Sequence, residues 1–292
     1  MRETFLKYLQ FEKRYSRHTI TSYDNDLRQF EAHLTDLPDN TDLIQANHRA
    51  IRSWVASLVN DGLEAKSINR KIASLRSFYK FLLKQEIISK SPTEKIQVLK
   101  TSKRLPMFVN EEDMRRLLDQ FNFPEDFVGL RDRVVIELLY GTGIRLSELI
   151  NLKVPDVNFD NKSIKVLGKR NKERIIPFSK SLEFLLHTYL EFSQQFRSPQ
   201  SVHLLIKEDG GQCYSMLIYR TVKKYIQQFS TIEKRSPHVL RHTFATHLLN
   251  KGAELNAVKD LLGHSSLAAT QVYTHNTLDK LKSVFDQAHP KA

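Results

Sequence analysis

Hydrophobic residues in the first hundred positions recur at the spacing of helices. Apolar side chains three and four residues apart predict one helix over 20–34 and others over 51–58 and 68–82. A short apolar cluster at 5–11 precedes them. We therefore expect residues 1–88 to form a helical bundle with its own core.

The helical pattern stops between residues 89 and 106. This stretch is polar and basic, and Pro92 and Pro106 interrupt it. We interpret it as a linker between two domains, the second of which spans 107–292. A length of 292 residues agrees with two domains.

The second domain changes its periodicity part-way along. Alternating apolar residues on both sides of the turn Gly168–Lys172 predict a β-hairpin with a basic tip. Residues 202–206 are expected to add one more strand. Helices are predicted at 134–140, 146–152, 181–192, 215–229, 239–251 and 254–262. The predicted fold class is mainly α, a helical bundle followed by a mixed α/β domain with a small antiparallel sheet.

Positive charge is spread over both predicted domains. The chain has 45 Lys and Arg against 33 Asp and Glu, for a net charge of +12. Residues 1–103 contain 18 basic and 12 acidic residues, and 104–292 contain 27 and 21, so each part carries +6. Two folded, positive parts suit a grip on a polyanion such as DNA. A basic enzyme with another substrate also fits this composition.

One predicted helix combines an apolar side with a basic side. Beside the apolar positions of 68–82 stand four basic residues, Arg70, Lys71, Arg76 and Lys80. A helix that binds in a DNA groove has this pattern, and so has an ordinary solvated helix, so both interpretations stay open.

Several classes of protein are excluded or disfavoured. No apolar run reaches the roughly 18 residues of a membrane span, and the N-terminus lacks the apolar stretch of a signal peptide. Cys213 is the only cysteine, which excludes an intrachain disulfide. We expect a cytoplasmic protein. Gly141-Thr142-Gly143 lacks the third glycine of a dinucleotide-binding motif, and we predict neither cofactor nor metal.

Histidine, arginine and tyrosine gather in the segment 236–275. His238 and Arg241 are three residues apart and share one side of a predicted helix. Gly263 is expected to end the next helix and to leave His264 at its mouth, and Tyr273 follows. Such a set, with no carboxylate nearby, suits charge neutralisation of a phosphate without a metal.

The same residues carry a family resemblance. The segments His238–His247, Leu262-Gly263-His264 and Val272-Tyr273 resemble the motifs of the tyrosine recombinases. Gly141–Leu149 resembles their first arginine motif and Gly168–Arg174 their lysine hairpin. The segments 67–82 and 288–290 are most similar to the Xer branch.

The resemblance implies a reaction with DNA. Tyr273 would attack the scissile phosphate to give a 3′-phosphotyrosyl link and a free 5′-hydroxyl, and a 5′-hydroxyl from another duplex would then reverse the step. Arg145 and Arg241 would bind the nonbridging oxygens. Neither ATP nor a metal is implied.

The resemblance also assigns the proton transfers. Lys169, favoured over Lys172, would protonate the leaving 5′-oxygen, and His238 would accept the tyrosine proton. His264 would donate a hydrogen bond to the phosphate. Glu148, three residues after Arg145, would hold that arginine without taking part in the chemistry.

Family membership further implies the assembly. The two domains would form a C-shaped clamp around double-stranded DNA. A tetramer of this chain, alone or with a second related recombinase, would join two sites, and a DNA translocase is a possible activator. The implied role is resolution of chromosome dimers at cell division, on the nucleoid. Two alternatives are a mobile-element integrase and a DNA-binding architectural protein without catalysis.

Overall fold

The computed structural model describes residues 1–39, 41–101, 107–168, 173–263, 285, 287 and 288. The chain divides into two compact units, Met1–Arg104 and Leu105–Ala292. Most described residues are helical, and three short strands form an antiparallel sheet in the second unit. The predicted fold class is confirmed.

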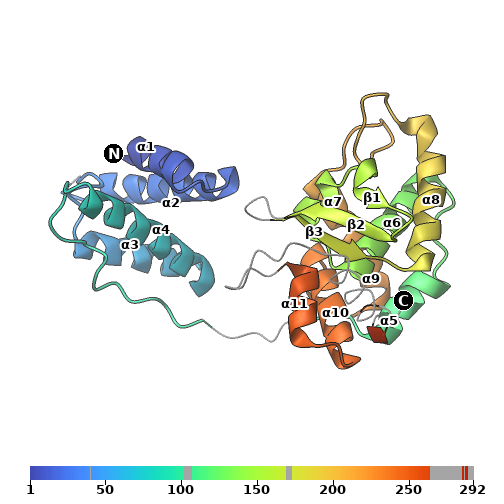
Figure 1. Cartoon of the computed structure of the whole chain (residues 1–292). Coiled ribbons are helices and arrows are strands. Elements are labelled where there is room, and N and C mark those ends of the chain that lie inside the picture. Colours follow the sequence, from blue (N-terminus) through green and yellow to red (C-terminus); the bar gives the residue numbers. More distant parts are fainter. Residues whose placement is uncertain (40, 102–106, 169–172, 264–284, 286, 289–292) are drawn as a thin grey trace. The chain divides into compact units, whose positions relative to one another are not determined.

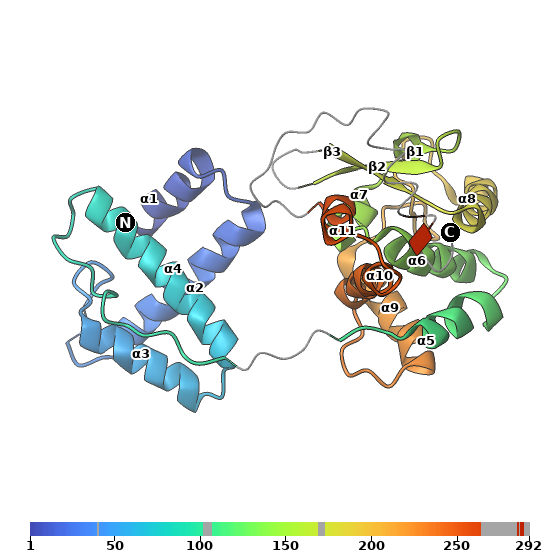
Figure 2. The same cartoon turned by 60° about the horizontal axis from the view of Figure 1, so that its bottom comes forward.

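The first unit contains helices only. They are α1 (Arg2–Lys7), the π-helix η1 (Tyr8–Glu12), α2 (Arg17–Thr35), α3 (His48–Asn60) and α4 (Ala65–Lys84). Figure 2 shows α2 and α4 crossing each other, and both bury their apolar sides in one core. Rings from four helices fill it: Phe5 of α1 packs on Phe78 of α4, and Phe30 of α2 packs on Trp54 of α3.

The first part of the predicted linker is packed on α4. Ile96 is buried in the core of the first unit. The Asn69 side chain donates to the Leu99 carbonyl at 2.9 Å and accepts from the Leu99 N–H at 2.8 Å. Arg76 donates to the Ile96 carbonyl at 2.5 Å. These bonds fix residues 96–99 to the bundle, so this stretch is not a free tether. The domain boundaries themselves stay a prediction.

The second unit combines a small sheet with helices. Its elements are α5 (Glu111–Arg115), the π-helix η2 (Arg116–Gln120), α6 (Phe127–Thr142), α7 (Leu146–Asn151), the 3₁₀ helix η3 (Val154–Asp156), β1 (Val157–Asn158), β2 (Ser163–Leu167), β3 (Glu173–Pro177), α8 (Lys180–Ser193), the 3₁₀ helix η5 (Gln194–Phe196), α9 (Ser215–Phe229), α10 (Pro237–Asn250) and α11 (Leu255–Leu262). Figures 1 and 2 show the sheet along one side of this unit, with α6, α9 and α10 on the other. Most residues of helix α6 are buried.

The strands pair in the order β1-β2-β3, with β2 in the middle. Val166 lies opposite Arg174, and Leu167 lies opposite Glu173 at the end of the hairpin. Partners in an antiparallel pair point to the same side of the sheet. Because Val166 points into the core, Arg174 does too, and both are buried.

Two expectations about secondary structure need correction. Residues 202–206 are not a strand, since they form only isolated bridges, Lys153 with His203 and Ile206 with Gln212. Leu204, Leu205 and Ile206 are buried, but Leu204 and Leu205 form a bend between the two bridges, so no ladder develops. The helix predicted at 134–140 begins earlier, at Phe127, because Asp126 caps it by accepting from the Gly129 N–H at 2.7 Å.

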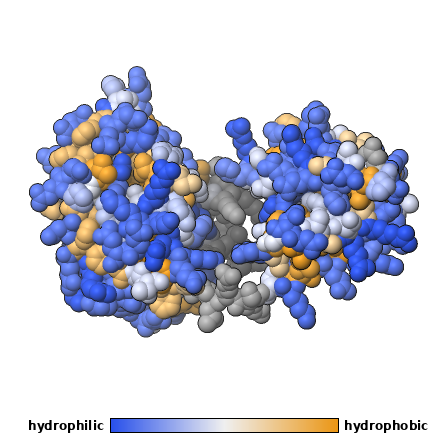
Figure 3. All heavy atoms as spheres, turned by 180° about the vertical axis from the view of Figure 1, so that it is seen from behind, coloured by the Kyte–Doolittle hydropathy of each residue, from blue (hydrophilic) through white to orange (hydrophobic). Residues whose placement is uncertain are grey.

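Polar side chains predominate on the face of the molecule in Figure 3, and apolar ones form scattered patches on both units. None of the helices in the described residues is both long and apolar enough to span a membrane.

Candidate active site

The site begins at the turn between α6 and α7. Arg145 precedes α7, and Glu148 lies in the first turn of that helix. Glu148 accepts from the Arg145 backbone N–H and from its Nη1, each at 2.8 Å. The carboxylate thus holds both the main chain and the side chain of Arg145, whose side chain is 24% exposed.

A second arginine reaches the same place from α10. Arg241 is 8% exposed. Its Nη1 donates to the Gly143 carbonyl and its Nη2 to the Leu262 carbonyl, the latter at 2.6 Å. Because a guanidinium has five N–H donors, these two bonds orient Arg241 and still leave donors for an anion.

Three arginines bind three consecutive carbonyls at the end of α11. Arg174 Nε donates to Leu261 at 3.0 Å, Arg241 Nη2 to Leu262 at 2.6 Å, and Arg145 Nη2 to Gly263 at 2.8 Å. The last carbonyls of a helix have no partner within it and carry partial negative charge. The helix end and the guanidinium groups therefore stabilise each other.

Two glycines allow this close packing. Gly143 and Gly263 end α6 and α11 with φ of +60° and +62°, in the left-handed region that other residues rarely adopt. A Cβ on Gly143 would lie 2.5 Å from the Phe244 ring, and one on Gly263 would lie 3.0 Å from the Arg174 side chain. Gly263 ends its helix as predicted.

Positive charge exceeds negative charge in this cluster. The cluster contains three guanidinium groups and one carboxylate, Glu148, to which Arg145 and Arg174 bind directly while Arg241 interacts with it through charge. Burial, followed by the nearby Arg145 and Arg174, lowers the pKa of Arg241 to about 9, so that it stays charged at neutral pH. Burial alone would raise the pKa of Glu148, but hydrogen bonds from Arg174 and Arg145 lower it to about 2. The cluster is therefore a permanent cationic site that suits an anion such as phosphate.

Comparison with known proteins identifies the architecture. Residues 107–279 match the phage integrase family, and residues 3–86 match the phage integrase N-terminal SAM-like domain. The chain belongs to the phage integrase family. These proteins are the tyrosine recombinases, site-specific enzymes that cut and rejoin DNA strands, and the resemblance noted in the sequence is confirmed.

Curated relatives extend over the full chain. Tyrosine recombinase XerC of Chlorobaculum parvum is 38% identical over 99% of this chain and 94% of its own. The Staphylococcus carnosus XerC is 38% identical over 100% of this chain and 98% of its own.

Solved structures share the fold. The Tn1549 transposon integrase, in complex with transposon right end DNA, has a TM-score of 0.73 at 21% identity over 97% of this chain and 98% of its own. The XerH recombinase bound to palindromic difH substrate has a TM-score of 0.72 at 24% identity, over 97% and 83%.

The structure brings together only part of the predicted catalytic set of this recombinase. Arg145 and Arg241 lie in the cluster together with Glu148, which was predicted only to hold Arg145, and His238 lies exposed on the first turn of α10. Three predicted residues, Lys169, His264 and Tyr273, lie outside the described residues. In the sequence, Lys169 falls between β2 and β3.

The four basic residues of α4 have different surroundings. Arg70 forks onto Asp26, and the buried Lys71 contacts both Asp26 and Gln29. Arg76 binds the Ile96 carbonyl at 2.5 Å and is otherwise exposed, and Lys80 is exposed. Most of these cations already have partners within the first unit, and contact with DNA stays a prediction.

Arg174 was not singled out from the sequence. It is 4% exposed, and its two Nη atoms each donate to one oxygen of Glu148 at 2.7 Å. The alternation in β3 contained a signal, because Arg174 stands two residues before Ile176, which faces the core. A buried arginine needs an acidic or carbonyl partner.

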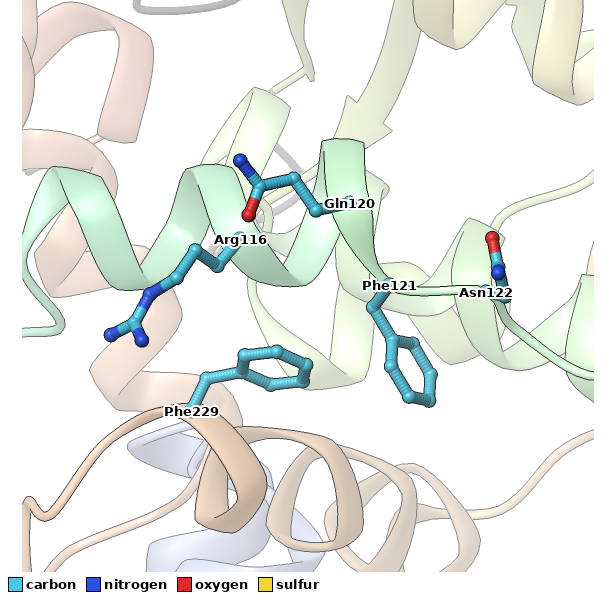
Figure 4. Close-up of a pocket in the computed structure, with 5 residues that line it drawn as sticks. All are labelled: Arg116, Gln120, Phe121, Asn122 and Phe229. Carbon is cyan, nitrogen blue, oxygen red and sulfur yellow. The ribbon is translucent and has the colours of Figure 1, made fainter.

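A shallow cavity of about 410 Å³ lies elsewhere in the second unit, between η2 and the end of α9. Figure 4 shows Phe121 and Phe229 beside it, with Arg116 at one edge. None of its lining residues belongs to the arginine cluster. A recombinase binds a long polyanion on an open surface, so this cavity is not the site of the reaction.

Within the described ranges, no group of three or more His, Cys, Asp or Glu residues is arranged to hold a metal ion.

Proposed function

We propose that this tyrosine recombinase resolves chromosome dimers, by recombination between two copies of one chromosomal site before cell division. The support is the full-length similarity to proteins named XerC. The observation that carries the catalytic part of the proposal is the arginine cluster at the end of α11. Its fixed positive charge would stabilise the negative charge that develops on a phosphate under attack by a protein nucleophile.

In the proposed mechanism, Arg145 and Arg241 bind the two nonbridging oxygens of the scissile phosphate. Their guanidinium groups are already oriented by Glu148 and by the carbonyls of Gly143, Leu262 and Gly263. Donors that are fixed before the reaction lose little free energy to reorganisation when charge develops in the transition state.

Tyr273 is the proposed nucleophile, and its oxygen forms a bond to phosphorus as the bond to the 5′-oxygen breaks. His238, exposed at the start of α10, accepts the tyrosine proton. Lys169, on the hairpin connection, gives a proton to the departing 5′-oxygen. His264, the residue after Gly263, donates a hydrogen bond to the phosphate. Rejoining reverses these transfers, so the reaction needs no external energy source.

We propose further that the working assembly is a tetramer on two double-stranded DNA sites, formed by this chain alone or with a second related recombinase. A DNA translocase that contacts the assembly is the proposed activator. The positive charge carried by both parts of the chain supports contact of both units with the duplex.

The decisive experiment is covalent trapping with a Tyr273→Phe variant. The unmutated chain and a nicked suicide substrate should give a denaturation-resistant protein–DNA complex. Tyr273→Phe keeps the ring and loses only the nucleophilic oxygen, so trapping should disappear while site binding remains. Tyr219, exposed on α9, provides the control. Trapping that survives in Tyr273→Phe and is lost in Tyr219→Phe would refute the assignment.

The biological role has a separate test. DNA recovered from covalent complexes in cells should map to one chromosomal site. Recovery of the ends of a mobile element instead would support the integrase alternative and refute dimer resolution.

A further inference from the structure

Arg174 binds both groups that hold Arg145 and Arg241 in place, the Glu148 carboxylate and the end of α11. It forks onto both oxygens of Glu148, each at 2.7 Å, and its Nε binds the Leu261 carbonyl at 3.0 Å. All three bonds are buried. The planar guanidinium thus links α7 to the end of α11 in one fixed geometry.

Both elements that it links hold the arginines proposed to bind phosphate. Glu148 accepts two bonds from Arg145 on its other side. The carbonyls that follow Leu261 accept from Arg241 and Arg145. Loss of Arg174 would remove two of the four hydrogen bonds that hold the Glu148 carboxylate, together with the side-chain bond to the Leu261 carbonyl in the last turn of α11.

Arg174 also stands next to the lysine hairpin. It is the second residue of β3 and pairs with Val166 across the sheet, one step from the pair that closes the hairpin. The residue therefore fastens the base of the hairpin to the two elements that hold the arginines.

We infer that Arg174 is a positioning residue for DNA cleavage, which acts through Glu148 and the end of α11 to fix Arg145 and Arg241. The inference rests on the proposed function of these arginines. Arg174 itself is buried and contacts no DNA in this account; it sets the place of the groups that do.

A purely structural role is the competing explanation, because removing one partner of a buried ion pair also destabilises a fold. Arg197 provides a matched control. It too is an arginine that binds consecutive backbone carbonyls, those of His203 and Leu204, each at 2.7 Å. None of its contacts belongs to the arginine cluster.

The experiment compares Arg174→Met, Arg174→Lys and Arg197→Met in the full chain. Single-turnover cleavage of a nicked suicide substrate is measured at a temperature at which circular dichroism shows each variant folded, and site affinity is measured separately. Arg174→Met should slow cleavage by about 10²-fold, the usual result of a small misplacement of reacting groups. Affinity should change less than about threefold. Arg174→Lys keeps the charge but loses the bidentate bond to Glu148, so its cleavage rate should lie between those of Arg174→Met and the unmutated chain. Arg197→Met should cleave at the unmutated rate.

A double variant identifies the route of the effect. If Arg174 acts through Glu148, adding Arg174→Met to Glu148→Gln should slow cleavage little beyond the slower single variant. Losses that multiply would overturn the route, and Arg174→Met that cleaves as fast as the unmutated chain would overturn the inference alone. If Arg174→Met does not fold, Arg174→Lys supplies the same comparison. An unmutated chain that forms no covalent complex would refute the proposed function as well.

Discussion

Each unit of this recombinase buries a carboxylate among cations, Asp26 in the first and Glu148 in the second, and the two networks differ in their surplus of positive charge. In the first unit, Asp26 accepts from Arg70, Lys71 and the Ser74 hydroxyl, the last at 2.7 Å. In the second, Glu148 accepts from Arg145 and Arg174.

The difference lies in the balance of charge. The cations around Asp26 bind that carboxylate, and Lys71, which is buried, also binds the Gln29 side chain. Beside Glu148 stands a further arginine, Arg241, which within the described residues binds only backbone carbonyls. Two cations stand against one carboxylate at Asp26 and three against one at Glu148, so the larger surplus of positive charge lies in the second network. The same residue types therefore serve the fold in one unit and the site in the other.

The largest expected effect concerns Lys169, the residue proposed to protonate the departing 5′-oxygen. Lys169→Ala should slow cleavage by about 10²–10⁴-fold, the usual range for loss of a general acid. DNA binding should change little, because one lysine is one charge among many. A substrate with sulfur in place of the bridging 5′-oxygen needs no proton to leave, so it should restore cleavage by the variant.

Lys172→Ala is the control within the same hairpin. If the sulfur substrate restores cleavage by Lys172→Ala but not by Lys169→Ala, the general acid is Lys172 instead. A sulfur substrate that Lys169→Ala cuts as slowly as the oxygen substrate would reduce Lys169 to a phosphate contact.

The pH dependence of stability should separate Glu148 from the rest of the protein. Its pKa of about 2 in the folded chain lies below the ordinary value of 4.5. The carboxylate therefore stabilises the fold fully above about pH 4.5, and this contribution is lost as the pH falls towards 2. Thermal unfolding followed by circular dichroism should show a steeper loss of Tm in this window for the unmutated chain than for Glu148→Gln. Parallel curves would contradict the assigned ion pairs.

The networks also explain how far the sequence was informative. Local spacing placed Glu148 beside Arg145, and alternation predicted the hairpin, because both depend on near neighbours along the chain. The contacts of Arg174 with Glu148 and Leu261 join residues 26 and 87 positions apart. Asp26 meets α4 across more than forty positions. Such pairs depend on tertiary packing, which periodicity does not specify. The sequence therefore did not show that basic residues of α4 already have partners within the first unit.

The smallest expected effect distinguishes two lysines on α4, the exposed Lys80 and Lys71, which is bound to Asp26. Each lysine that neutralises a phosphate contributes about 0.9 to the slope of log K against log salt. Lys80 is exposed, so Lys80→Ala should reduce the slope by about that amount if α4 contacts DNA. Lys71→Ala should leave the slope unchanged in the folded protein, because its ammonium group is already bound by Asp26. A larger change for Lys71 than for Lys80 would reverse this assignment.

The contrast between the two carboxylates is tested most directly by one paired measurement, in which Glu148→Gln and Asp26→Asn are compared for unfolding free energy and for single-turnover cleavage in the folded state. Both substitutions keep the size of the side chain and remove its charge. Asp26→Asn should lower the unfolding free energy by about 3–5 kcal/mol, as expected when one partner of a buried ion pair is removed, yet folded protein should cleave at nearly the unmutated rate. Glu148→Gln should slow cleavage by about 10²-fold under conditions in which it is fully folded. Equal cleavage by folded Glu148→Gln and Asp26→Asn would contradict the account.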